Sequence, residues 1–285
     1  MYLEDLIRAI VSQCKHTTVY AYADDIKLMS TDYNDLQKAL DVVNMWIGEW
    51  GLLLNKSKSE HLVIRNKDPK TLYIGDQPIP KVSFVRDLGL TLSDDLSSKQ
   101  YIGKIRARAN TLSHILHRTF LTHNHTFRIN LFKIYIRPIL EYNTCSWSPH
   151  LQSDIKSVES VQRRYTKIVC QKSNIKFSNY SDRLKILNLD SLQTRRDKND
   201  LTMLYKIIYG LVDIDFSHLF CFSNFHGHNL RRHNLHIERH RPAKSLVRQS
   251  FFSNRTIKHW NNLPSTTVNS LSIAIFKLNL KDWQS

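Results

Sequence analysis

The sequence predicts an α+β fold, in which a small antiparallel sheet with one helix precedes a mostly α-helical region. Short β-rich runs separated by turn residues crowd residues 1–98. From residue 100 onward, apolar residues recur at helical spacing over long stretches. With 41% hydrophobic residues among 285, the chain can bury a core, which excludes a wholly disordered protein.

The first predicted elements are a hairpin and a helix. Residues 18–30 contain two β-rich runs around a short polar break, a pattern typical of a hairpin. Thr31 can cap the next helix, and Gly51 can end it. Because its apolar residues form a broad stripe, we expect this helix to lie on the sheet. The stripe comprises Leu36, Ala39, Leu40, Val42, Val43, Trp46, Ile47 and Trp50.

Short strands are then expected at residues 52–55 and 61–65, on either side of a turn at 56–60, and near 71–74 and 82–92. Together with the hairpin and the helix, they make residues 1–98 a small α+β unit.

Four longer helices are predicted after residue 98. The second is expected to end or bend at Pro138, and the fourth, at residues 192–208, to end before Gly210. Residues 223–248 are poor in apolar residues and predict a loop, before a short helix from Ser270. The stripe of the first long helix is Ile102, Ile105, Ala109, Leu112 and Leu116, that of the second is Phe127, Leu131 and Ile134, and that of the third is Ile155, Val158, Gln162, Tyr165 and Val169. The short helix from Ser270 has Ile273, Phe276 and Leu280.

Charge is divided unevenly along the chain. The formal net charge is +16, and it results from −3 over residues 1–98 and +19 over residues 99–285. Such an excess of Lys and Arg favours a polyanionic partner, nucleic acid above all. A basic surface that only keeps the protein in solution is the alternative.

Composition excludes several classes of protein. The glycines are too scattered for a G-x-G-x-x-G or Walker loop, which excludes a Rossmann or P-loop nucleotide site. Glu4 and Asp5 argue against a secretory signal, and no apolar run approaches about 18 residues. We therefore expect an intracellular protein, nuclear or cytoplasmic, that does not cross a membrane. Four distant cysteines fit free thiols in a reducing compartment: Cys14, Cys145, Cys170 and Cys221.

The sharpest chemical feature is the run Tyr22-Ala23-Asp24-Asp25, at the tip of the predicted hairpin. Two adjacent carboxylates repel each other unless a cation lies between them, and Mg²⁺ prefers carboxylate and phosphate oxygens. Two such ions can activate a 3′-hydroxyl and stabilise a leaving pyrophosphate. Because Asp is also a common turn residue, a hairpin tip without chemistry is the alternative for these four residues.

The order of motifs after this run resembles that in reverse transcriptases of non-LTR (LINE-type) retrotransposons. Residues 54–60 (LNKSKSE) and 84–92 (FVRDLGLTL) come after the helix, as palm motifs do in that family. The resemblance implies an RNA-directed DNA polymerase in which Asp24 and Asp25 bind Mg²⁺. It also implies that Lys58 assists pyrophosphate departure as a general acid. Tyr22, in the aromatic-Ala-Asp-Asp box, and Gly89, in a primer-grip turn, are expected to contact nucleic acid.

The resemblance continues to the end of the chain. Four further segments are similar to the helical thumb region of these proteins and to the region after the thumb. They are residues 135–142, 147–149, 184–192 and 260–264, together with Arg195 and Arg196. The resemblance divides the chain into three parts. Residues 1–98 are the C-terminal part of a palm, 99–175 a thumb-like helical region, and 176–285 a basic helical extension.

Parts of the family's pattern are absent from this sequence. The fingers, a glycine-containing nucleotide motif and the strand with a third metal-binding aspartate precede the Asp-Asp box in the family. Between residues 1 and 17, no acidic residue lies on an evident strand. We therefore expect a fragment with little or no polymerase activity alone. A non-catalytic protein that binds nucleic acid through its basic helices, and an interaction protein that binds another polyanion, are the alternatives. The sequence predicts no oligomeric state.

Five basic residues are candidates for contact with the RNA template and the DNA primer. Lys104, Arg108 and Arg118 fall on one side of the first long helix, and Arg163 and Arg164 lie off the apolar stripe of the third. Phosphates would be their targets, and a merely solvated outer face is the alternative. The fourth helix carries three more cations, Arg195, Arg196 and Lys198.

A His-rich stretch admits a zinc site, which we disfavour because its spacing fits no usual plan of two cysteines and two histidines. A basic loop that contacts RNA is preferred. The His and Cys residues of the stretch are Cys221, His226, His228, His233, His236 and His240, and its arginines are Arg231, Arg232, Arg239 and Arg241. Three tryptophans, Trp46, Trp50 and Trp260, are assigned to the core.

Overall fold

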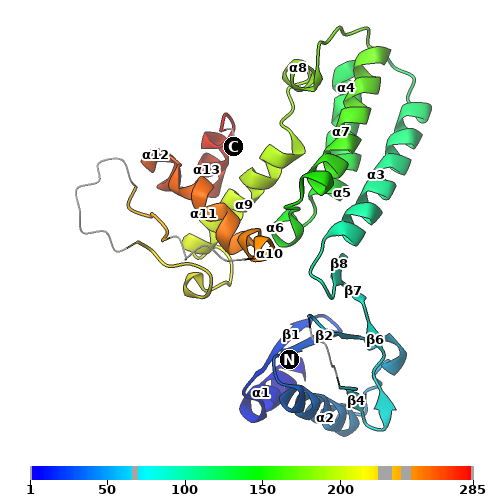
Figure 1. Ribbon diagram of the computed structural model, residues 1–285, viewed down its shortest axis with the longest axis vertical. Helices are drawn as coiled ribbons and strands as arrows, with labels where there is room; N and C mark the ends of the chain where they lie inside the picture. Colours follow the sequence, from blue (N-terminus) through cyan, green and yellow to red (C-terminus); the bar gives the residue numbers. More distant parts are fainter. Residues whose placement is uncertain (1, 66–69, 224–232, 239–244, 284–285) are drawn as a thin grey trace. The chain divides into compact units, whose positions relative to one another are not determined.

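The computed structural model describes residues 2–65, 70–223, 233–238 and 245–283. The chain forms two compact units, Met1–Ser97 and Ser98–Ser285 (Figure 1). The first combines helices with short strands and the second is helical, so the predicted α+β class is confirmed. The predicted subdivision of the helical part at residue 175 stays a prediction. No described helix is long and apolar enough to span a membrane.

The first unit is built on a hairpin covered by two helices. Its opening elements are α1 (Tyr2–Gln13), β1 (Thr17–Tyr22), β2 (Asp25–Ser30) and α2 (Tyr33–Glu49). One face of the hairpin presents Val19, Ile26 and Leu28 to the core shared by the helices. The predicted hairpin and the helix that lies on it are therefore confirmed. The core of these elements comprises Leu6, Ile10, Cys14, Ala39, Val42, Val43 and Trp46.

Both ends of α2 are set by local hydrogen bonds. The N-cap is Asp32, whose carboxylate accepts from the Asp35 N–H, so the prediction of Thr31 was wrong by one residue. At the other end Gly51 has φ +61°, and the Leu52 N–H donates to the Ile47 carbonyl. That pattern is a Schellman motif, which confirms Gly51 as the stop.

The rest of the first unit consists of short pairings. A 3₁₀ turn, η1 (Lys56–Lys58), precedes three two-stranded sheets: β3–β6 is parallel, and β4–β5 and β7–β8 are antiparallel. The strand predicted at residues 52–55 is not formed, and these residues connect the end of α2 to η1. The strands are β3 (His61–Leu62), β4 (Tyr73–Ile74), β5 (Gln77–Pro78), β6 (Lys81–Val82), β7 (Phe84–Asp87) and β8 (Leu90–Ser93).

The second unit begins with long helices that pack side by side (Figure 1). On α3 (Lys99–Thr119) and α7 (Gln152–Lys172), most of the predicted apolar stripe is buried, and the predicted arginines and lysines face outward. Between them the chain forms α4 (His125–Leu131), η2 (Phe132–Ile136), α5 (Arg137–Glu141) and α6 (Thr144–Trp147).

The second predicted helix was expected to end or bend at Pro138, and it does not end there. The segment η2 is a π-helical turn, closed by the Arg137 N–H donating to the Phe132 carbonyl, and α5 continues through the proline. A π turn holds one extra residue and rotates the helix after it, so the apolar face shifts. Ile134, inside the π turn, is 62% exposed, and Phe127, in the first turn of α4, is 40% exposed. The buried apolar residues are Ile129, Leu131, Phe132, Ile136 and Leu140.

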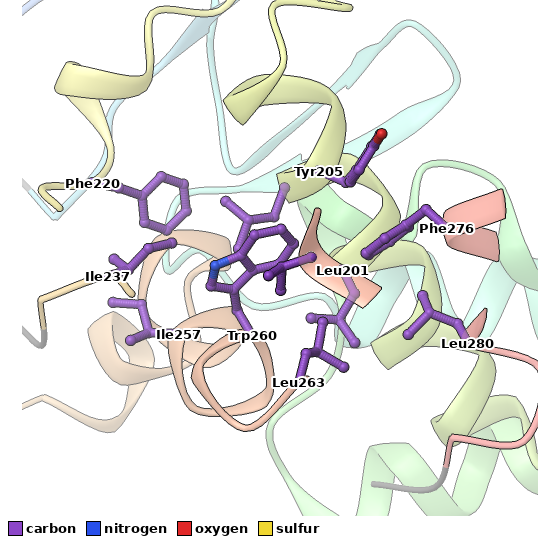
Figure 2. Close-up of a cluster of buried hydrophobic side chains, with 11 residues drawn as sticks. Leu201, Tyr205, Phe220, Ile237, Ile257, Trp260, Leu263, Phe276 and Leu280 are labelled. Carbon is purple, nitrogen blue, oxygen red and sulfur yellow. The ribbon is translucent and has the colours of Figure 1, made fainter. Parts of the chain in front are cut away.

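The C-terminal elements surround one buried tryptophan. Trp260 is 0% exposed and lies at the middle of a cluster to which α9 (Leu192–Ile208), α11 (Phe252–Asn261) and α13 (Ile273–Asn279) contribute (Figure 2). Trp46 and Trp260 are core residues as predicted, whereas Trp50 is 45% exposed, because it caps the exposed end of α2. The remaining elements are α8 (Tyr180–Ile186), η3 (Phe216–His218), α10 (Leu246–Gln249) and α12 (Ser265–Val268).

Candidate functional site

The two acidic residues of the Tyr-Ala-Asp-Asp run lie at the apex of the β1–β2 hairpin. Tyr22 pairs with Asp25 across the strands, which leaves Ala23 and Asp24 as a two-residue turn. Ala23 has φ +51°, a left-handed conformation that residues with a Cβ rarely adopt. Positive φ at only the first central residue is the pattern of a type II′ turn, where Gly is the usual choice. The hairpin therefore accepts strain at the residue next to the acids.

Asp24 and Asp25 are free to accept a ligand. Both side chains are exposed, and neither forms an ion pair or a hydrogen bond with another described side chain. Adjacent carboxylate oxygens are donors that Mg²⁺ accepts, so the residues present fit a divalent cation. Within the described ranges, no third Asp, Glu, His or Cys joins them to form a metal-binding group.

The outer face of the hairpin carries the polar and aromatic residues. Directly paired residues point to the same side, so Tyr20 with Lys27 and Tyr22 with Asp25 share the face opposite the helices. Tyr20 and Tyr22 are 55% and 66% exposed. Tyr20 was missed in the sequence, although the period of two that places Tyr22 beside the acids also applies to it.

An ion pair connects this hairpin to the β7–β8 hairpin. Lys27 on β2 binds Asp87, the last residue of β7. The turn after Asp87 consists of Leu88 and Gly89, with φ +44° and +88°. Two central residues with positive φ form a type I′ turn, which explains the glycine. The structure thus brings the predicted Gly89 turn and the Asp-Asp hairpin together in one unit.

Lys58 is not brought to the carboxylates. It lies in η1 with an exposed side chain, and no ion pair joins it to Asp24 or Asp25. Its predicted general-acid role stays a prediction.

The basic candidates of the second unit differ in their surroundings. Lys104, Arg108 and Arg118 are exposed along α3, and Arg164 is exposed on α7. The Arg163 side chain stacks on the Tyr180 ring, with its guanidinium carbon 4.4 Å from the ring centroid, so it also has a structural contact.

The three cations of α9 lie close together in the sequence but differ in their burial and in their partners. Arg196 is 0% exposed, and only its Nη2 donates to a described partner, Gln193. Arg195 forms an ion pair with Glu141, and Lys198 with Asp190. The sequence names Arg196 only as one of three cations on this helix, whereas α6, α7, α11 and α13 all pack against α9 in the structure.

The zinc interpretation of the His-rich stretch finds no support among the described residues, where no metal-binding group occurs. The Nε2 atom of His233 is 3.1 Å from the Trp260 carbonyl, and burial lowers the pKa of this histidine. Several residues of the interpretation lie outside the described ranges: His226, His228 and His240, with Arg231, Arg232, Arg239 and Arg241 of the preferred basic loop.

Comparison with known proteins finds a family model similar to the first unit. The model of the family described as Reverse transcriptase (RNA-dependent DNA polymerase) matches residues 1–93. No solved structure gives a significant match.

Two curated relatives extend the comparison. The chain is 27% identical over 126 residues to an uncharacterized protein of Caenorhabditis elegans, which covers 44% of this chain and 64% of that protein. It is 21% identical over 175 residues to a probable RNA-directed DNA polymerase from transposon X-element of Drosophila melanogaster. This alignment covers 59% of this chain and 18% of that protein. The chain thus spans less than two thirds of either relative. The predicted resemblance to a non-LTR retrotransposon reverse transcriptase is confirmed.

Proposed function

We propose, since residues 1–93 match the model of the reverse transcriptase family, that Asp24 and Asp25 are metal-binding carboxylates of a nucleotidyl-transfer site. The observation that carries this proposal is their position at the apex of a hairpin, exposed and without partners among the described side chains. Bound Mg²⁺ would activate a primer 3′-hydroxyl and stabilise the leaving pyrophosphate. The two aspartates would hold and orient the ions beside the primer end.

A third carboxylate is needed to fix two ions, and the described residues supply only two at this place. We propose that it comes from a strand that adds to the hairpin, as the family resemblance implies. The 285 residues are therefore expected to bind metal weakly and to extend a primer only when such a strand is supplied.

The surrounding residues are proposed to position nucleic acid. Tyr22 offers an exposed ring beside Asp25 on which a base can stack. Gly89 lies in a turn with positive φ, where the backbone can approach a primer closely. Lys58 would have to approach the aspartates to protonate pyrophosphate, because no ion pair among the described residues joins it to either carboxylate.

Metal binding by the full chain tests the assignment. Mn²⁺ titration followed by electron paramagnetic resonance should show a site that is weakened at least tenfold in Asp24→Asn and Asp25→Asn. Asp76→Asn is a matched control, since Asp76 is another exposed turn carboxylate of the same unit. Equal Mn²⁺ affinity in all four proteins would sink the proposal.

A second candidate function, non-catalytic binding of nucleic acid, is favoured by one observation. The net charge is +19 over residues 99–285 and −3 over residues 1–98. Lys104, Arg108, Arg118 and Arg164 project outward from two neighbouring helices. RNA binding by residues 98–285, which form a compact unit, should then persist without the hairpin. Its log K should fall with log salt by about 0.7 for each phosphate contacted. A salt-independent affinity would argue for a different ligand.

A further inference from the structure

A cavity of about 430 Å³ lies in the second unit, where segments distant in sequence meet. The residues that line it include Lys133 in η2, Arg137 in α5, Arg195 in α9 and Lys281 with Trp283 near the C-terminus. Pockets of roughly 300–1,000 Å³ are the usual size for small ligands. The cavity is therefore large enough for a ligand of moderate size.

The wall of this cavity has an excess of positive charge. Four cations line it, against two acids, Asp190 and Asp282. Asp190 is already bound to Lys198, at 2.9 Å. In the described part of the chain, the ammonium groups of Lys133 and Lys281 pair with no acidic side chain. These two lysines are thus available to a bound anion.

Arg137 and Arg195 lie close together and share one carboxylate. Arg195 Nη2 is 2.8 Å from Glu141 Oε2, and Arg137 Nε is 3.9 Å from the same oxygen. Burial and the charge of Arg195 lower the pKa of Arg137. Asp190 also acts on both guanidinium groups, but it is paired with Lys198 as well, so Glu141 and Asp190 face three cations and a further anion at Arg137 would be stabilised.

An aromatic ring lines the same cavity. Trp283 is half-buried and is held edge-on against His259, with ring centroids 5.4 Å apart and an interplanar angle of 86°. Indole rings are good platforms for nucleobases, and phosphates are the usual targets of grouped Lys and Arg. Asn188, which also lines the cavity, adds an amide that can donate or accept hydrogen bonds.

We propose that this cavity binds one nucleotide through its phosphate, with Lys133, Arg137 and Lys281 at the phosphate and Trp283 at the base. The volume suits a single nucleotide, either free or at the 5′-phosphorylated end of a strand. Asp24 and Asp25 take no part, so the site is independent of the function proposed for the hairpin.

Binding by the full chain tests this site with two pairs of probes. The first pair is one short single-stranded RNA with a 5′-phosphate or a 5′-hydroxyl, followed by fluorescence anisotropy. The second pair is AMP and adenosine, followed by calorimetry. We expect the phosphate to strengthen binding about tenfold or more in at least one pair. Preference for the phosphorylated strand alone identifies a strand end as the ligand, and preference for AMP alone identifies a free nucleotide.

Substitutions locate the effect in the cavity. The double variant Lys133→Gln with Lys281→Gln should abolish the preference, whereas Lys277→Gln, an exposed lysine of α13 outside the cavity, should keep it. Trp283→Leu should weaken AMP and leave inorganic phosphate binding unchanged. Thermal unfolding by circular dichroism confirms that each variant is folded. The proposal is overturned if phosphate adds no affinity in either pair, or if the double variant keeps the preference.

Discussion

Asn261 binds the backbone of Ile237 with both ends of its side-chain amide. Its Oδ1 accepts from the Ile237 N–H at 2.9 Å, and its Nδ2 donates to the Ile237 carbonyl at 2.8 Å. Ile237 is 0% exposed, so the two backbone groups have little access to water. This contact holds residues 233–238 against α11. Asn261 belongs to the segment 260–264, one of those on which the family resemblance rests.

Asn261→Ala should therefore destabilise the second unit by about 2–4 kcal/mol, because two backbone groups at a buried residue lose their partners. Chemical denaturation followed by circular dichroism measures the loss. Asn262→Ala, the exposed neighbour, is the control and should change stability by less than about 0.5 kcal/mol. Similar losses in the two variants would show that the amide contact does not stabilise the fold.

Asp200 and Arg255 form a buried two-point ion pair. The distances are 2.7 Å from Arg255 Nε and 3.0 Å from its Nη2 to the two Asp200 oxygens, and the Asp200 side chain is only 4% exposed. Asp200→Asn leaves the guanidinium without a counter-charge and should cost about 3–5 kcal/mol. Glu4→Gln breaks the exposed pair with Arg8 and should cost under about 1 kcal/mol. Urea denaturation compares them, and equal effects would contradict the assignment.

His117 should make stability depend on pH. Burial and the nearby charges of Arg128 and Lys172 lower the pKa of this histidine from 6.5 to about 4 in the folded protein. The unfolded chain takes up its proton first, so the stabilisation is complete above pH 6.5 and is lost as the pH falls toward 4. Between pH 7 and 4.5 the contribution of His117 should fall by roughly 2–3 kcal/mol.

His117→Gln isolates that effect, since Gln offers Arg128 an acceptor but does not titrate in this range. The free energy of unfolding of the two proteins should diverge at high pH and converge at low pH. A constant difference from pH 7 to 4.5 would show that His117 titrates alike in both states.

Ala23 at φ +51° predicts an unusual gain from glycine. Ala23→Gly should stabilise the first unit by about 0.5–1 kcal/mol, because the relief of strain exceeds the extra entropy of the unfolded chain. Ala21→Gly, two residues earlier in regular strand, should destabilise by a similar amount. Thermal unfolding of both variants checks the opposite signs, and a loss in Ala23→Gly would contradict the strained turn.

The elements that the sequence predicts best have local signals at both ends. Residues 192–208 match α9 because the Ser191 hydroxyl caps its N-terminus and Gly210, with φ +61°, comes just after its last turn. The Asp-Asp hairpin likewise results from alternation and a short turn. The position of this hairpin in the sequence was predictable, but the ion pair between Lys27 and Asp87 was not.

Features that depend on tertiary packing were missed. The π turn before Pro138 changes which side of the helix is apolar, and no residue type marks it in advance. Arg196 looks like a surface cation in the sequence, yet it is fully buried. The cavity between η2, α9 and the C-terminus brings together residues about 150 positions apart, a proximity that spacing within one helix does not report.

The strands β1 and β2 pair only with each other in the described ranges, and this has a consequence for the behaviour of the purified protein. The outer edge of each strand has amide and carbonyl groups that form no hydrogen bonds with a neighbouring described strand, and such an edge can pair with an added extended segment. A complementing strand and a second copy of this hairpin would compete for the same edges. A low concentration of this protein should therefore favour pairing with the complementing strand, and a high concentration should favour association of two copies of the protein.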